Sequence, residues 1–188
     1  HTALRRQRQM CIRDSNTIFI FTTDNGTTLG RNIFNAGMRG SKGSEYDGGH
    51  RVPFLVHWPA GNLDQKRSVN TLTSFVDIVP TLLDLCGATK IPPALKFDGI
   101  SIRKLLSEGD HKGWPDRFLI TDSQRVRDPI KWRKSSVMSE RWRLVNGNEL
   151  YHIDNDPGQK KDLSAENPQQ VKKMCTFYND WWAELEPT

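Results

Sequence analysis

Residues 17–26 read Thr17-Ile18-Phe19-Ile20-Phe21-Thr22-Thr23-Asp24-Asn25-Gly26, and this stretch decides the predicted fold. Its first six residues are apolar, β-branched or aromatic, without the alternation of a half-exposed strand. Such a run is typical of a buried strand in a parallel sheet covered on both faces. An acid and an amide, Asp24 and Asn25, then follow the carboxyl end of the strand, where open α/β sheets bind ligands.

A second strand is predicted at residues 51–58, with Pro53 near its start, where a missing N–H donor is tolerated. Half of the chain's 14 glycines lie between the two strands: Gly26, Gly30, Gly37, Gly40, Gly43, Gly48 and Gly49. So much glycine indicates tight turns or close approach of the backbone to a ligand. The spacing is not that of a phosphate-binding loop before a helix, so no nucleotide site is predicted.

The totals bound the possible classes of protein. The chain has 188 residues, enough for one domain with a core and a small appendage. It carries 27 basic and 22 acidic residues, and its net charge of +5 favours anionic partners without naming one. No apolar run approaches the roughly 20 residues of a membrane-spanning helix. The chain begins with His1, and a parallel strand near residue 17 needs neighbours, so we expect the back portion of a longer protein.

Three cysteines, Cys11, Cys86 and Cys175, are too few and too scattered for a disulfide framework or a zinc site. Cys86 and Cys175 fall on apolar helix faces and are predicted to be buried free thiols. His50 and His57 are interpreted as structural hydrogen-bonding residues rather than catalysts. Residues 1–15 are expected to be disordered or foreign to the natural protein, with a basic nucleic-acid-binding arm as the alternative.

The later elements follow from local signals. A helix is predicted over residues 73–86 and stops at Gly87, and a short helical piece follows at residues 102–106. A strand at residues 117–121 precedes a meander of three strands at 136–138, 141–145 and 149–153, with Asn146-Gly147 as the hairpin turn. Residues 154–158 lack the spaced ligands of a calcium loop and are interpreted as a turn.

The last helix is predicted to begin with Asn167 as its cap and Pro168 at its first position. Its apolar stripe includes Trp181 and Trp182, which are interpreted as packing residues rather than a sugar platform. The basic loop at residues 125–134 could grip an anionic sugar, but it is interpreted as a solvated face.

Two of these stretches resemble blocks of the arylsulfatase-type sulfatases: residues 16–26 are similar to the metal-binding strand, and residues 37–53 to the lysine loop. Residues 75–83, 98–101, 149–151 and 156–158 match later blocks in the same order. The resemblance runs from about residue 14 to the end, and residues 1–13 match nothing. It implies an alkaline-phosphatase-like α/β fold, with a mixed sheet and flanking helices. A small C-terminal antiparallel sheet would pack on the terminal helix. The expected divisions are residues 1–15, unmatched; 16–115, part of the catalytic domain; and 116–188, a C-terminal subdomain.

The resemblance also implies a site. Asp24 and Asn25 would be two ligands of an active-site Ca²⁺, with Mg²⁺ possible, and Lys42 would contact the substrate sulfate. Carboxylate and amide oxygens suit such hard cations, and a lysine between glycines is a compact cation that can approach an oxyanion. The family hydrolyses sulfate esters through a formylglycine made in a Cys/Ser-x-Pro-x-Arg motif. Sulfated small molecules or carbohydrates are the implied substrates, and a periplasmic, secreted or lysosomal location is implied.

The chain also departs from the family's pattern, because no cysteine or serine stands in Cys/Ser-x-Pro-x-Arg. The paired aspartates that complete the family's metal site, and the catalytic histidine and lysine of its N-terminal half, have no counterparts in these residues either. We therefore expect the 188 residues alone to be inactive on sulfate esters. A related phospho- or phosphono-ester hydrolase is an alternative, but such enzymes usually bind two metals through extra His and Asp ligands. Net charge alone suggests a third reading, a non-catalytic binder of anionic polymers, although no nucleic-acid motif is recognisable.

Overall fold

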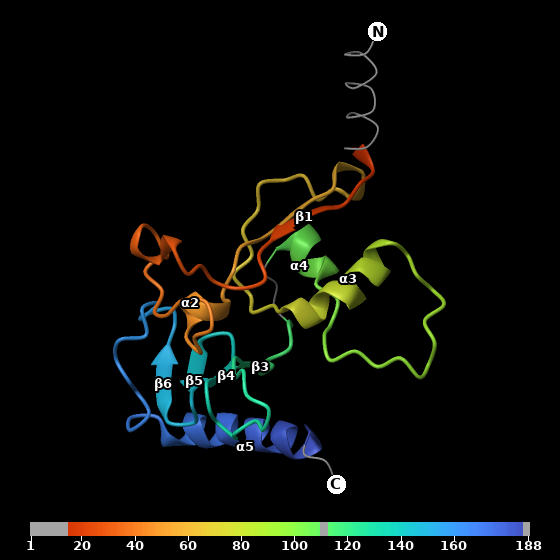
Figure 1. The fold of residues 1–188 in the computed structure, drawn as a ribbon. Helices are drawn as coiled ribbons and strands as arrows, with labels where there is room; N and C mark the ends of the chain where they lie inside the picture. The colour runs from red at the N-terminus through yellow and green to blue at the C-terminus, as the bar shows by residue number, and fades with distance from the viewer. Residues whose placement is uncertain (1–14, 110–112, 186–188) are drawn as a thin grey trace. The chain divides into compact units, whose positions relative to one another are not determined.

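The computed structural model describes residues 15–109 and 113–185, so Cys11 and the basic segment before it lie outside the described residues. Contacts divide the chain into two units, each described by itself below (Figure 1). The first holds the residues up to Thr22 together with Phe54–Trp114. The second holds Thr23–Pro53 together with Pro115–Thr188. The glycine-rich segment thus belongs to the same unit as the C-terminal sheet.

The first unit contains a two-stranded sheet of β1 (Phe19–Thr22) and β2 (Phe54–His57). The strands are antiparallel, with Phe19 opposite His57 and Thr22 opposite Phe54. The prediction of a parallel strand buried on both faces was therefore wrong for this chain. Phe19 is 46% exposed and Phe21 is 60% exposed, because a two-stranded ribbon leaves both of its faces largely uncovered. A parallel pair needs a crossover connection, usually a helix, and the longest helix described between β1 and β2 is a four-residue turn.

The helices of the first unit agree with the predicted positions. A 3₁₀ turn at Phe75–Asp77 (η3) leads into α3 (Ile78–Leu85), and α4 (Arg103–Glu108) follows. Gly87 adopts φ 66° just beyond α3, which confirms it as the stop residue. Asp77 is fully buried, and its carboxylate accepts the Ser74 N–H at 2.8 Å and the Ile100 N–H at 3.0 Å. Cys86 is a free but exposed thiol, so the prediction that it is buried was wrong, because it caps the helix end.

The second unit is built on a four-stranded antiparallel sheet in the order β3 (Leu119–Asp122), β4 (Ser135–Met138), β5 (Trp142–Val145) and β6 (Glu149–His152). Asn146 and Gly147 have φ 50° and 76°, which confirms the predicted hairpin between β5 and β6. The final helix, α5 (Pro168–Leu185), begins after Asn167 as expected, and the Asn167 carbonyl accepts the first helical N–H groups. The segment at residues 154–158 is a turn.

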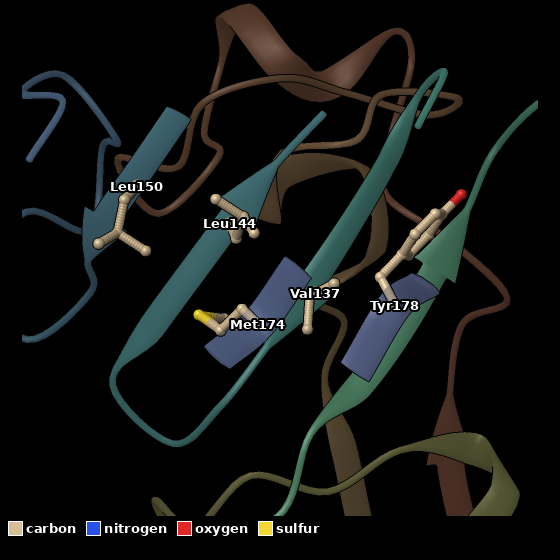
Figure 2. Close-up of a cluster of buried hydrophobic side chains, with 5 residues drawn as sticks. All are labelled: Val137, Leu144, Leu150, Met174 and Tyr178. Carbon is tan, nitrogen blue, oxygen red and sulfur yellow. The ribbon is translucent and has the colours of Figure 1, made fainter. Parts of the chain in front are cut away.

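The core of this unit lies between the sheet and α5. Fully buried side chains from three strands meet two from the helix (Figure 2): Val137, Leu144, Leu150, Met174 and Tyr178. Trp181 and Trp182 lie 5.4 Å and 5.9 Å from the Tyr178 ring, which confirms their packing role. Side chains alternate along a strand, so the neighbours of Leu144 and Leu150, Arg143 and Tyr151, point to the opposite face of the sheet.

Candidate functional site

Backbone hydrogen bonds join the turn after β1 to the lysine loop, residues 37–53. The Gly26 N–H donates to the Gly49 carbonyl at 3.0 Å, and the Lys42 N–H donates to the Thr27 carbonyl at 3.2 Å. A Cβ atom on Gly26 would lie only 1.9 Å from the Gly48 carbonyl oxygen. Glycine here lets two segments of backbone approach each other closely. The structure therefore places the backbone of the Asp24-Asn25-Gly26 turn beside the loop that carries Lys42.

Lys42 lies at the tip of a tight turn within this loop. The Ser44 N–H donates to the Ser41 carbonyl at 2.9 Å, and the glycines on either side, Gly40 and Gly43, have φ 87° and 79°. The two segments that flank this tip are called the first leg (residues 37–41) and the second leg (residues 43–53). They are joined by a hydrogen bond that the Gly48 N–H donates to the Arg39 carbonyl at 2.8 Å. The Lys42 side chain is exposed at the tip, so its position follows from how the legs are held.

A buried ion pair anchors the second leg. Asp47 is the first residue of the short helix α2 (Asp47–His50), and its carboxylate lies 2.9 Å from the Arg143 guanidinium on β5. The two side chains are 1% and 6% exposed. Burial raises the pKa of Asp47, but His50 and Arg143 outweigh it, and the pKa is lowered from 3.8 to about 2. Asp47 is therefore a carboxylate at neutral pH.

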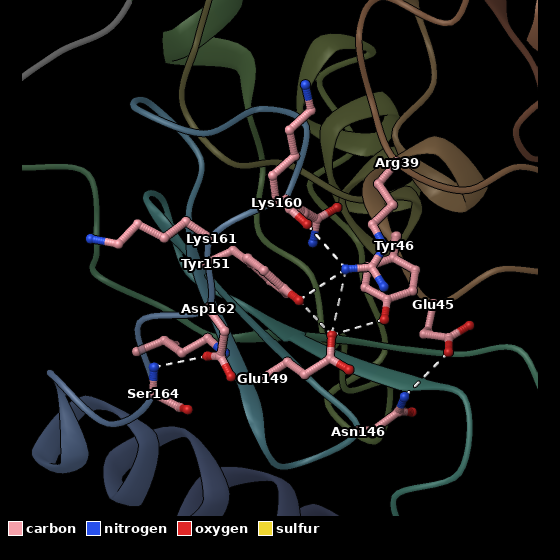
Figure 3. A network of polar contacts seen from close by, with 12 residues as sticks. Arg39, Glu45, Tyr46, Asn146, Glu149, Tyr151, Lys160, Lys161, Asp162 and Ser164 are labelled. Carbon is pink, nitrogen blue, oxygen red and sulfur yellow. Dashed lines mark hydrogen bonds and ion pairs between the residues drawn. The ribbon is translucent and has the colours of Figure 1, made fainter.

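Arg39 on the first leg and Tyr46 on the second leg contact polar side chains of β6 (Figure 3). Arg39 donates to the Tyr151 hydroxyl at 3.0 Å, and its guanidinium lies 3.8 Å from the centre of the Tyr46 ring. The Tyr46 and Tyr151 hydroxyls both donate to Glu149, at 2.8 Å and 2.5 Å. Burial and the bond to Glu149 raise the pKa of Tyr46 to about 12, so this hydroxyl remains a donor at neutral pH.

Gln159 contacts both legs. Its main-chain carbonyl accepts a hydrogen bond from Arg39 at 3.1 Å, and its side-chain Oε1 accepts the Asp47 N–H at 2.8 Å. The residue is fully buried and has φ 48°. Sequence reasoning missed Asp47, Arg143 and Gln159 as contributors to this site. Their partners lie about a hundred residues apart in the chain, and no local pattern marks such pairs.

The two histidines take different positions. The His50 ring lies 3.6 Å from the Asp47 carboxylate, and its buried ring nitrogens make no hydrogen bond to any described residue. His50 therefore lies against the buried Asp47 carboxylate as a structural residue, and it helps to lower the pKa of that carboxyl group. His57 is an exposed residue of β2, in the other unit.

The basic loop at residues 125–134 carries exposed cations, which confirms the predicted solvated face. Its tryptophan, Trp132, stacks on Tyr178 with ring centres 3.7 Å apart. The described part of the chain contains no helix long and apolar enough to cross a membrane.

The metal ligands expected from the sequence form at most a partial site. Among residues 15–109 and 113–185 no group of three or more His, Cys, Asp or Glu side chains could hold a metal ion. Asp24 is exposed and Asn25 is half-buried, and they contribute a carboxylate and an amide oxygen. This donor chemistry fits a hard cation such as Ca²⁺, which usually takes 6–8 oxygen ligands, so two side chains would be part of a larger set.

Comparisons with known proteins agree on one class. The family model described as Sulfatase matches residues 12–88, starting two residues before the start of the resemblance given above. A protein named Sulfatase from Formosa agariphila is 32% identical over 170 residues, which cover 82% of this chain and 30% of the relative. The fold is the alkaline-phosphatase-like α/β fold of these enzymes, and the chain belongs to the sulfatase family.

Solved structures support the same fold. The crystal structure of Ps i-CgsB in complex with k-i-k-neocarrahexaose superposes with a TM-score of 0.76 at 27% identity, over 96% of this chain and 38% of that one. The structure of BT4656 in complex with its substrate D-glucosamine-2-N,6-O-disulfate superposes with a TM-score of 0.66 at 17% identity, over 96% and 38%. The chain thus spans about a third of the length of these three proteins.

Proposed function

We propose that this chain is part of a metal-dependent sulfatase that hydrolyses sulfate esters in the longer protein. The observation that carries the proposal is the pair of backbone hydrogen bonds, Gly26 to Gly49 and Lys42 to Thr27. They hold a carboxylate and an amide after a strand end beside a loop whose tip is a lysine. Because the chain belongs to the sulfatase family, we interpret this arrangement as one half of a sulfate-binding site.

Asp24 and Asn25 would hold Ca²⁺, or alternatively Mg²⁺, through their side-chain oxygens. A cation held there would supply positive charge to orient a sulfate group and to stabilise negative charge that develops on its oxygens. Lys42 contributes a second positive charge, carried at an exposed loop tip that can reach an anionic group. The nucleophile expected for the family, a formylglycine, has no counterpart in these 188 residues. The chain alone is therefore expected to bind cation and sulfate without turnover.

The proposed substrates are sulfated carbohydrates or small sulfated molecules. Support comes from BT4656, whose substrate is a disulfated glucosamine, and from the carbohydrate complex of Ps i-CgsB. We also infer a location outside the cytoplasm, in the periplasm, the lysosome or the medium, from the family.

Calcium titration calorimetry on the purified chain tests the metal ligands. Replacing Asp24→Asn removes one charged ligand and keeps the shape, so we expect Ca²⁺ binding at least about 10-fold weaker. Asp64→Asn, at an exposed position in the other unit, is the matched control and leaves binding unchanged. Equal binding by the two variants would exclude Asp24 as a ligand.

A chromogenic assay tests the reaction. The chain alone is expected to give no hydrolysis of an aryl sulfate, whereas the protein extended by its upstream coding sequence is expected to be active and to lose activity with Lys42→Ala. Turnover by the chain alone that Asp24→Ala abolishes would contradict the proposed division of the site. A preference of the extended protein for an aryl phosphonate over the aryl sulfate would favour the phosphono-ester alternative.

A further inference from the structure

Gln159 has a combination of properties that its place in a turn does not require. It follows Asp156 in a tight turn, where its N–H donates to the Asp156 carbonyl at 3.0 Å. Its φ of 48° is uncommon for a residue with a side chain, and such a conformation persists where surrounding contacts determine it. The side chain is nevertheless fully buried rather than solvated. Its contacts, not the turn, account for this placement.

Those contacts reach the lysine loop on both sides of Lys42. The main-chain carbonyl of Gln159 binds the Arg39 guanidinium, three residues before the lysine, and Oε1 binds the N–H of Asp47, five residues after it. The two legs are also joined to each other by the bond from Gly48 to Arg39. Gln159 therefore closes a ring of hydrogen bonds that joins the two legs at the base of the loop.

We propose that Gln159 is a positioning residue for Lys42, acting through the two legs of the lysine loop. The proposal rests on the proposed function, in which Lys42 contacts the sulfate group. The tip itself contains two glycines with positive φ and has little intrinsic preference for one conformation. The position of the tip therefore depends on the base of the loop, where Gln159 accepts hydrogen bonds from Arg39 and Asp47. A cation that must meet a small anion loses binding when its support permits displacements of about 1 Å.

The substitution Gln159→Met tests this role, because methionine keeps the length and flexibility of the side chain and removes its acceptor. Gln124→Met is the matched control. Gln124 likewise clamps a loop through its amide, accepting the Ile130 N–H at 2.8 Å and donating to the Ile130 carbonyl at 2.9 Å, but it lies far along the chain from residues 37–53. Both variants lose the same chemical group from a loop clamp.

Two measurements on ¹⁵N-labelled chain separate positioning from general stability. Amide hydrogen exchange is expected to speed up at least about fivefold in Gln159→Met at Asp47, whose buried N–H loses its acceptor, and at Lys42 and Gly48, whose hydrogen bonds open when the loop is less firmly held. It is expected to stay unchanged in Gln124→Met. Titration with inorganic sulfate, followed at the Lys42 amide, is expected to show at least about 10-fold weaker binding in Gln159→Met only. The global urea midpoint is recorded for each variant.

The outcomes discriminate between the two ideas. Equal exchange in both variants, or faster exchange with unchanged sulfate affinity, overturns the positioning role. Sulfate affinity that survives Lys42→Ala refutes the proposed sulfate contact, whereas the exchange comparison still decides whether Gln159 holds the loop. If Gln159→Met does not fold, Arg39→Gln removes the other bond to Gln159 from a side chain that is 43% exposed. It must then show the same two changes, and their absence overturns the proposal.

Discussion

Breaking the ion pair between Asp47 and Arg143 should lower the free energy of unfolding of the second unit more than a substitution at its surface does. In Arg143→Met the Asp47 carboxylate, 1% exposed, loses a partner at 2.9 Å and stays buried. The Arg143 guanidinium also donates to the Ser139 carbonyl at 2.6 Å, and this bond is lost too. Removing one partner of a buried pair typically costs about 3–5 kcal/mol. We therefore expect the free energy of unfolding, measured by urea denaturation at pH 7 with tryptophan fluorescence, to fall by about that amount.

A neighbouring arginine supplies the control. Arg141 lies 3.5 Å from Asp154, and both side chains are more than half exposed, so Arg141→Met should cost only about 0–1 kcal/mol. The double variant Asp47→Leu with Arg143→Met removes both charges together and should recover most of the lost stability, because apolar replacement of a whole buried pair is often neutral. An Arg143→Met variant no less stable than Arg141→Met would refute the burial of this pair in solution.

Three further predictions concern single groups. The pKa of Asp47 is lowered from 3.8 to about 2, so its ionisation contributes roughly 2 kcal/mol of stability above pH 3.8, lost as the pH falls towards 2. Urea midpoints between pH 5 and 2 should fall accordingly in the wild type, and a flat profile would contradict this. Gly49→Ala places a Cβ atom 2.0 Å from the Ser44 carbonyl oxygen and should lower the free energy of unfolding, measured in urea, by about 1–3 kcal/mol. An unchanged value would contradict the close contact. Burial raises the pKa of Cys175 while Cys86 is exposed, so peptide mapping after brief iodoacetamide treatment should find Cys86 modified before Cys175; the reverse order would contradict the structure.

Local signals in the sequence predicted the elements whose form depends on near neighbours. Gly87 ends α3, Asn146-Gly147 turns the hairpin, and Asn167 with Pro168 begins α5, because each depends on the backbone preferences of one or two residues. The packing of the α5 stripe also followed from its spacing. The family resemblance carried the assignment of the whole, since several blocks in the same order are more specific than any single motif.

The direction of the first strand pair could not be predicted in the same way. An apolar run such as residues 17–22 indicates burial, but the pairing direction depends on how the chain returns, and here β2 returns antiparallel to β1. The partner of His50, a residue expected to be structural, could not be named for a related reason. Nothing near His50 in the sequence indicates that the Asp47 beside it faces Arg143, and that pairing determines what the imidazole meets.

The anchoring of the lysine loop also explains why a buried ion pair suits this place better than apolar packing. Ordering a loop that contains so many glycines costs more conformational entropy than ordering an average segment, and contacts at its base must offset that cost. Apolar side chains could offset that cost as well, but apolar contacts are not directional, so the loop could shift and still bury them against other apolar neighbours. Oδ1 of Asp47 accepts a hydrogen bond from Arg143, and the Asp47 N–H donates one to Gln159, so a shifted loop would break both bonds while the groups stay buried. Compared with an apolar contact, the ion pair therefore adds little net stability, but it fixes the position of the loop on the sheet. The position of the exposed Lys42 ammonium follows from that of the loop.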